Sequence, residues 1–353
     1  MSEQPAFLSA KGWLGLIVSV VVVLAVPALL RSGDLVRYPF DEAPLRALQA
    51  SHPDCVLVGD SMLRTRIDPA RLNEIADRRC DVLGYPGTAT AVWYLIVKNI
   101  IARLSPPPHW TIILFRDRQL TLPAMRTEGR YKNGLEPFML GREPEFQETL
   151  EKAQRRRLPV FERLSLFIYP AQKHRYERSE DLHERALNLV SNSATKPLLR
   201  DAAKELFDLN NLRNNAAPAA SGNNDEREPV SADDATFAAS VNGSFLPMIL
   251  DTAERRHIKL LFFRVKHRPP ANAPFVEEEP GARRYQRDLQ TYLTKRGAVL
   301  FDENREADIT LPFYGEGDHV TDTMMRPYTE LFWKKIRPLL SNSTAGNSPA
   351  EAP

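Results

Sequence analysis

Short apolar runs alternate with longer helical segments along this 353-residue chain, and this alternation limits the possible fold more than any other feature. The first run, residues 54–58, is rich in valine and ends at Gly59, which is typical of a strand buried on both faces of a sheet. Similar runs stand at 80–83, 111–115, 258–265 and 298–301. Because a β-α-β-α order requires right-handed crossovers, the sequence predicts an α/β fold with a doubly wound parallel sheet.

The helices expected between these strands have recognisable ends. Asp68 and Pro69 open the first helix, as N-cap and first-turn residue, and this helix should run to about residue 77. Thr88 is the expected cap of a long apolar helix over 89–104. Further helices are predicted over 285–296 and 322–337.

One α/β domain is expected over residues 50–340, and it carries a helical insertion at about 120–255. The insertion should contain helices at 143–157, 179–190 and 195–209. Residues 210–232 are rich in Asn, Ala, Ser and Pro, so we expect a flexible loop there. Residues 341–353 have a similar composition and should form a disordered tail, and residues 31–49 should form a linker.

Residues 12–30 carry no charged side chain and are preceded by a short tail, residues 1–11. At about 1.5 Å per helical residue this segment is long enough to cross the hydrocarbon core of a bilayer. Trp13 stands at its edge, where an indole ring prefers the membrane interface. The sequence therefore predicts a single transmembrane anchor. A cleaved signal peptide is the alternative, but its apolar core is usually shorter, and no A-x-A-like site follows Leu30.

The charges that flank this segment give only a weak indication of its orientation. Arg31, Arg37 and Arg46 follow the span, whereas Lys11 precedes it. This distribution leans slightly against an external C-terminal domain. Large domains, however, cross the membrane largely regardless of flanking charge.

The overall composition excludes some classes of function. The formal net charge is only +2 and no basic stripe stands out, so we expect no nucleic-acid partner. Cys55 and Cys80 are the only cysteines, which are too few for a zinc site, and no metal or cofactor is expected. Two small core residues are the favoured interpretation of this pair. A disulfide, which would fit an oxidising compartment, is the alternative.

Two segments carry the residue types of a serine nucleophile and its base. Ser61 ends the tripeptide Gly-Asp-Ser directly after the first strand, and ligands of such sheets bind outside the carboxyl ends of the strands. His319 lies in a glycine-rich loop after the last strand, with Glu316 and Asp318 close by. A serine hydroxyl needs an imidazole to take its proton and a carboxylate to orient that imidazole. We therefore expect Ser61 and His319 to be neighbours.

Together these segments resemble the SGNH (GDSL-type) esterases and acyltransferases, whose fold is flavodoxin-like. The family's first block, Gly-Asp-Ser after strand one, is similar to residues 59–61. Its last block, Asp-x-x-His before the terminal helix, is similar to residues 316–319. This spacing puts Glu316 at the position of the triad acid, and Asp318 is the rival. The resemblance covers roughly residues 50–120 and 255–340.

The resemblance also implies an oxyanion site. The family's second block is a glycine after strand two, and Gly87 best fits that position. The third block is Gly-x-Asn-Asp after strand three, where this chain has Phe-Arg-Asp-Arg at 115–118 and no Asn. Arg116 stands at the position of the Asn and can donate N–H bonds to an oxyanion.

Three further residues are assigned to the substrate. Asp60 belongs to the first block, and Arg264 and Lys266 lie at the end of the fourth strand. The two cations would bind an anionic sugar or hold a partner. A solvated strand end is the alternative interpretation of these charges.

The anchor and the weak third block are most similar to those of the membrane-anchored SGNH-like proteins that work beside membrane-bound O-acyltransferases. These proteins act in alginate and cellulose acetylation and in teichoic acid D-alanylation. The resemblance implies a single-pass protein of the cell inner membrane with its soluble domain on the periplasmic or extracytoplasmic side. The implied partners are the membrane, a polysaccharide or other acyl acceptor, and a membrane-bound O-acyltransferase.

The function expected from this resemblance is that of an O-acyltransferase or esterase. It would act on an exported or cell-envelope polysaccharide through an acyl-enzyme on Ser61. A catalytically silent, membrane-anchored scaffold or carbohydrate-binding subunit is the first alternative, because the Asn is missing and Glu316 replaces Asp. A lipase or thioesterase with a soluble substrate is the second alternative, although no long apolar lid is visible.

Overall fold

The computed structural model describes residues 40–127, 131, 134–141, 143–157, 236–315 and 317–342. All of them belong to one compact unit, which comprises Arg37–Arg157 and Val230–Pro353. No helix in these ranges is long and apolar enough to cross a membrane. Several predicted features lie outside the described residues: the anchor at 12–30, the helices at 179–190 and 195–209, the loop at 210–232, the tail beyond 342, and Glu316.

Five parallel strands form one sheet, in the order β2-β1-β3-β4-β5. The strands are β1 (Cys55–Gly59), β2 (Cys80–Gly84), β3 (Trp110–Phe115), β4 (Lys259–Arg264) and β5 (Val299–Asp302). Each lies within one residue of its predicted position. Every residue of β1 and β3 is buried, which is why these segments read as continuous apolar runs. The predicted α/β class with a parallel sheet is confirmed.

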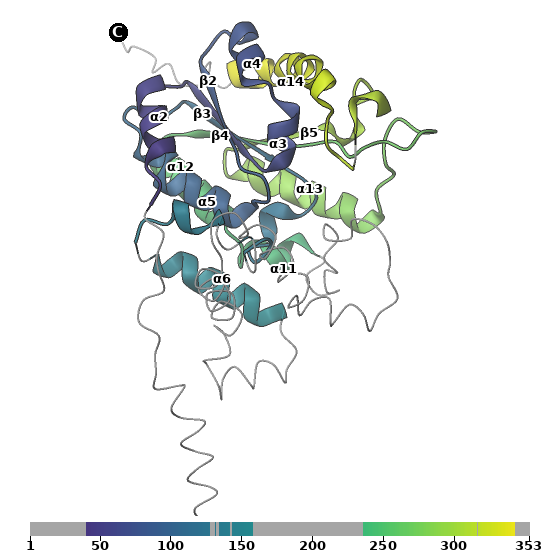
Figure 1. Cartoon of the computed structure of the whole chain (residues 1–353). Coiled ribbons are helices and arrows are strands. Elements are labelled where there is room, and N and C mark those ends of the chain that lie inside the picture. The colour runs from purple at the N-terminus through teal and green to yellow at the C-terminus, as the bar shows by residue number, and fades with distance from the viewer. Residues whose placement is uncertain are drawn as a thin grey trace, which may run out of the picture. The chain divides into compact units, whose positions relative to one another are not determined.

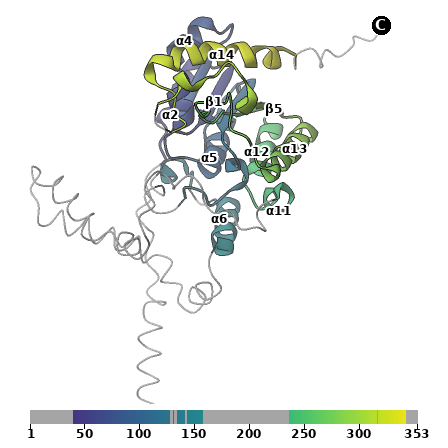
Figure 2. The same cartoon turned by 90° about the vertical axis from the view of Figure 1, so that its right-hand side faces the viewer.

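Helices cover both faces of the sheet (Figures 1 and 2). Side chains alternate between the faces along each strand, so that Val56 and Val58 join one core and Cys55 and Leu57 the other. The first core packs against α2 (Ala43–Ser51), α5 (Thr90–Asn99), α12 (Leu246–Arg255) and α13 (Pro280–Lys295). The second core packs against α3 (Ser61–Arg66), α4 (Pro69–Ile75) and α14 (Asp322–Asn342).

The folded domain includes residues of the predicted linker, and the start of the insertion packs on its core. Leu45 and Leu48 of α2 are buried in the first core, so the folded unit extends into the predicted linker 31–49. Within the bounds of the predicted insertion, 120–255, the structure describes three α-helices, namely α6 (Pro144–Arg157), α11 (Phe237–Val241) and α12. Phe146 of α6 stacks on Phe245 with ring centroids 5.0 Å apart, so the start of the insertion packs on the first core.

Two predicted helix caps have different outcomes. Asp68 caps α4, because its Oδ1 accepts hydrogen bonds from the N–H groups of Ala70 and Arg71, and this prediction is confirmed. The predicted Thr88 cap is wrong, because Ala89 occupies the N-cap position of α5. The Thr88 hydroxyl instead donates to the carbonyl of Tyr85 at 2.7 Å. The helix also ends at Asn99 instead of Leu104, and the 3-10 turn η1 (Ile101–Arg103) follows it.

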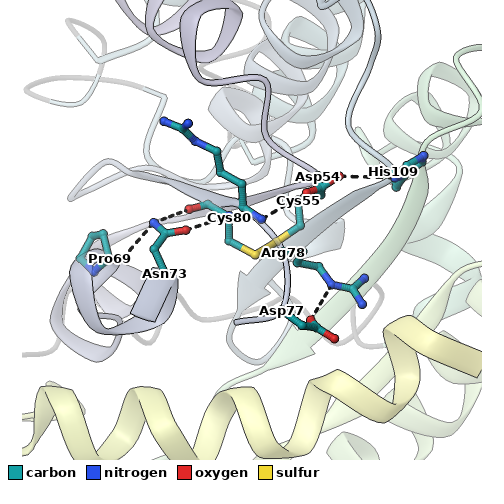
Figure 3. Close-up of a disulfide and its surroundings, with 9 residues drawn as sticks. Asp54, Cys55, Pro69, Asn73, Asp77, Arg78, Cys80 and His109 are labelled. Carbon is teal, nitrogen blue, oxygen red and sulfur yellow. Dashed lines mark hydrogen bonds and ion pairs between the residues drawn. A yellow bond between two sulfur atoms is a disulfide. The ribbon is translucent and has the colours of Figure 1, made fainter. Parts of the chain in front are cut away.

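A disulfide joins the first residues of β1 and β2 (Figure 3). Cys55 and Cys80 are opposite each other in the strand register, with their Cα atoms 4.6 Å apart, and both are fully buried. Asn73 of α4 holds the same point of β2, since its side chain bonds both the N–H and the carbonyl of Cys80. Of the two interpretations of these cysteines, the disulfide is therefore the one found, and it lies at the amino ends of the strands.

Candidate active site

The direction in which the chain winds around the sheet reverses between β1 and β3. The chain leaves β1 through α3 and α4 on one face, and it returns from β2 to β3 through α5 on the other face. Ligands of doubly wound sheets bind where the winding reverses in this way. Ser61 is the second residue after the end of β1, and Arg116 directly follows β3.

Ser61 is the first residue of α3, and its position is fixed by the two residues before it. Asp60 is extended and buried, and its Oδ1 accepts the N–H of Met62 at 2.8 Å, which caps the helix. Gly59 leaves no room for a side chain, because an added Cβ would lie 2.8 Å from the Cβ of Leu63. The helix therefore folds back tightly on the end of β1 and holds Ser61 at the sheet edge.

His319 lies in a loop that is closed on itself by backbone contacts. Tyr314 and Val320 form an isolated antiparallel bridge, and the N–H of Gly315 donates to the carbonyl of His319 at 2.9 Å. The loop places His319 Nε2 3.1 Å from Ser61 Oγ, although the two residues are 258 positions apart in the sequence. The structure thus brings the predicted nucleophile and base into hydrogen-bond contact.

The Asp318 carboxylate binds other partners than the His319 imidazole. Its Oδ2 accepts from Arg116 at 2.9 Å and lies 3.0 Å from His267 Nδ1, and its Oδ1 accepts from the N–H of Arg268 at 2.8 Å. In the described ranges no hydrogen bond joins Asp318 to the His319 ring. Glu316 lies outside the described residues, so the choice between the two carboxylates as the orienting acid stays a prediction.

His267, just beyond β4, lies between two carboxylates. Its Nε2 is 2.7 Å from Asp117 Oδ1, and its Nδ1 is the atom that faces Asp318. Burial lowers the pKa of His267, but the hydrogen bonds to Asp117 and Asp318 outweigh it and raise this pKa to about 9. Burial conversely raises the pKa of Asp318, but the bond from His267 outweighs this effect, so the net pKa is well below its ordinary value.

Gly87 lies in a turn that is tied to the loop of Ser61. Its φ of +75° is in the left-handed region, and an added Cβ would lie 3.1 Å from the ring of Tyr131. Arg126 connects this turn with the nucleophile loop, because one of its nitrogens donates both to Asp60 Oδ2 and to the carbonyl of Thr88. The glycine is thus held in the same part of the site as Ser61, and its oxyanion role stays a prediction.

Arg116 is buried, and its guanidinium is turned toward the loop of His319. One nitrogen contacts Asp318, as described above, and the Arg116 backbone N–H donates to Gln119 Oε1 at 2.8 Å. The side chain therefore reaches a carboxylate next to the predicted base. Its assignment as the second oxyanion donor stays a prediction.

The three residues assigned to the substrate are buried and bound within the protein. Asp60 pairs with Arg126, and Arg264 pairs with Glu278 and with Asp302 at 3.0 Å. Lys266 donates to the carbonyl of Glu306, and burial lowers the pKa of its ammonium group. All three residues are at least 98% buried, so the alternative of a solvated strand end is wrong for Arg264 and Lys266, and the substrate role of the three residues stays a prediction.

Sequence reasoning missed three of the residues that connect these segments, namely Gln119, Arg126 and His267. Gln119 and Arg126 follow no motif that a single sequence reveals. His267 is different, because it stands beyond the carboxyl end of a buried strand, as Ser61 does. That position was a usable signal, which the flanking cations Lys266 and Arg268 obscured.

A groove lined by other residues than Ser61 and His319 is present elsewhere on the domain. It lies between α4 and α14 and is lined by Arg71, Ile75, Glu330, Trp333, Lys334, Arg337 and Pro338. Among the described residues, no three His, Cys, Asp or Glu side chains are grouped to hold a metal ion.

No protein-family model matches the chain, and no curated protein matches its sequence.

Proposed function

We propose that the chain is an SGNH-type serine enzyme that forms an acyl-enzyme on Ser61. The observation that carries this proposal is the 3.1 Å contact between Ser61 Oγ and His319 Nε2 at the carboxyl edge of the sheet. The strand order β2-β1-β3-β4-β5 is that of flavodoxin-like folds, to which the SGNH family belongs, and it supports the same assignment.

The proposed chemistry has two acyl-transfer steps. Ser61 Oγ attacks the acyl carbonyl while His319 takes its proton, and His319 then returns the proton to the departing group. In the second step His319 takes a proton from a sugar hydroxyl or from water, whose oxygen attacks the acyl-serine. His319 then returns this proton to Ser61 Oγ as the bond between Oγ and the acyl carbon breaks. The Gly87 N–H would stabilise the negative charge on the carbonyl oxygen in both steps.

The particular function proposed is that of a membrane-anchored O-acyltransferase or esterase for an exported or cell-envelope polysaccharide. The charge-free segment 12–30 supports the anchor. The disulfide between Cys55 and Cys80 supports placement in an oxidising compartment outside the cytoplasm. A reporter fused after Leu340 that is active only in the cytoplasm would contradict this placement.

The direct test is labelling of the full chain with a fluorophosphonate probe, followed by mapping of the modified peptide. We expect modification at Ser61 and none in Ser61→Ala. Ser51→Ala is the matched control, because the Ser51 hydroxyl also bonds a side chain, but this is the carboxylate of Asp81 at the amino end of the sheet and no histidine faces it in the described residues. A chain that is labelled equally with and without Ser61 would contradict the proposal.

A catalytically silent scaffold or carbohydrate-binding subunit is the second candidate. The observation that favours it is the Arg116 guanidinium, which contacts Asp318 where an SGNH enzyme has an Asn that faces the oxyanion. This candidate predicts that the full chain binds a polysaccharide and is not labelled at Ser61. The labelling experiment therefore distinguishes the two functions.

A further inference from the structure

The two ring nitrogens of His267 both face carboxylate oxygens that come from other segments. Asp117 follows β3, and Asp318 belongs to the loop of His319. A neutral imidazole has one N–H donor and one acceptor nitrogen, whereas the imidazolium has two donors. Ionised carboxylates only accept hydrogen bonds. This geometry therefore selects the protonated form of His267, because only that form donates to both neighbours.

The charges around His267 support the same protonation state. The two carboxylates are the groups that approach the ring, and each is also near a guanidinium. Arg116 lies 2.9 Å from Asp318, and the positive charges of Arg116 and Arg264 both lower the pKa of Asp117. Two arginines and one imidazolium thus face two carboxylates in this cluster. The shared bonds raise the pKa of His267 to about 9, in agreement with the geometry.

The segment that contains His267 also holds the loop of His319 through its next residue. The Arg268 backbone N–H donates to Asp318 Oδ1, and the Arg268 guanidinium donates to the carbonyl of Gly315, both at 2.8 Å. With the bond from His267, this segment makes three contacts to the loop. Arg116 makes another from the end of β3. Three of these four contacts converge on the carboxylate of Asp318, the residue next to His319.

We propose that protonated His267 is a positioning residue that clamps Asp117 to Asp318 and thereby holds His319 at Ser61. This inference rests on the proposed function and concerns an imidazole separate from the catalytic one. When His267 loses its proton, one ring nitrogen becomes an acceptor and faces a carboxylate oxygen without a hydrogen between them. That contact turns repulsive, and the loop loses one of its connections to β3 and β4.

The first test measures the rate of fluorophosphonate labelling of Ser61 in the full chain between pH 6 and pH 10.5. We expect the wild-type rate to fall above about pH 9. His267→Gln should label about 10²-fold more slowly at pH 8, since a displaced catalytic group costs about this much, and it should show no fall near pH 9. His109→Gln is the matched control, because His109 also lies beside an aspartate, Asp54, but at the amino edge of the sheet. It should behave as wild type.

A wild-type rate in His267→Gln, or the same alkaline fall in that variant, would overturn the clamp. Thermal unfolding of each variant shows whether a slow rate comes from a chain that fails to fold.

The second test does not depend on activity or on a variant of His267. The imidazole resonances of the isotope-labelled full chain are followed with pH, and we expect His267 to titrate near pH 9. Asp117→Asn and Asp318→Asn should each lower this midpoint. A wild-type midpoint at or below the ordinary 6.5 would overturn the clamp. If Ser61 is not labelled at all but His267 titrates near pH 9, the proposed function fails and the charge clamp stands as a structural feature.

Discussion

The parallel sheet has an amino edge, where its strands begin, and a carboxyl edge, where they end, and the two are held by different kinds of interaction. At the amino edge, Cys55 and Cys80 are joined covalently, and Asn73 adds neutral hydrogen bonds beside them. At the carboxyl edge, the segments after β1, β3 and β4 meet through charged groups around Asp60 and Asp318. The first kind is insensitive to proton concentration, whereas the second depends on it. Stability and chemistry should therefore respond separately when either edge is altered.

The largest effect on activity is expected from substitution of Ser61 or His319 at the carboxyl edge. Ser61→Ala and His319→Ala should each lower the release of acetate from an activated ester on the order of 10⁶-fold. In the proposed mechanism Ser61 supplies the attacking oxygen, and His319 serves as base and then as acid, so neither is replaceable. The melting temperature should hardly change, because neither substitution removes a buried contact of the core. Full activity in Ser61→Ala would remove the enzymatic function and leave the scaffold.

The next largest effect should distinguish the two carboxylates of the loop. Glu316→Gln should lower the same activity by about 10⁴-fold, the cost of removing an orienting carboxylate in serine proteases. Asp318→Asn should cost less, because this carboxylate binds Arg116, His267 and Arg268. It should lower the melting temperature instead, since those donors lose a charged acceptor. The reverse order of activities would show that Asp318 turns to the imidazole during the reaction.

At the amino edge the expected effect is on stability alone. The disulfide closes a loop with a sequence separation of 25 residues, for which the loss of cross-linking costs about 3 kcal/mol of unfolding free energy. A chain with both Cys55→Ala and Cys80→Ala should show this loss in urea unfolding. Its rate of ester cleavage at 25 °C should equal that of wild type. A loss of activity without a loss of stability would mean that the two edges are coupled.

The smallest effect concerns the pH dependence of stability. The pKa of His267 is raised from its ordinary 6.5 to about 9, so the folded state binds the proton more tightly than the unfolded chain does. This contribution is fully present below pH 6.5 and is lost as the pH rises through about 9. It should amount to roughly 1–3 kcal/mol. Urea unfolding at pH 6 and pH 10 should show a difference between wild type and His267→Gln that vanishes at pH 10. A constant difference would contradict it.

The sequence was sufficient to predict the strands, because each is a short apolar run, and those of β1 and β3 are buried along their whole length. It failed to predict α3, whose six residues include four polar or charged side chains on a short segment without helical periodicity. This helix forms because Asp60 caps it and Gly59 allows it to approach β1. The predicted Thr88 cap does not form, because the Thr88 hydroxyl donates to the carbonyl of Tyr85 instead.

The candidate site was predictable where the topology alone determines position. Ser61 and His319 each follow a strand, and parallel strands place their carboxyl ends at the same edge of the sheet. β3 and β4 lie between β1 and β5, so the segment after β5 is what carries His319 to Ser61. The partners of Asp318 were not predictable, because Arg116, His267 and Arg268 come from two separate segments and their pairing depends on side-chain directions. The same holds for Arg264 and Lys266, whose charges suggested a surface but whose burial is balanced by local partners.

The disulfide has a consequence for how the sheet opens. β2 and β5 are its two outer strands, and outer strands usually exchange their amide hydrogens through local opening because only one side is paired. The bond from Cys80 to Cys55 prevents β2 from separating from β1 unless β1 also moves, whereas β5 has no such link. The amides of β2 should therefore exchange as slowly as those of an interior strand. Fraying is then confined to β5, on the side of the sheet where His267 lies.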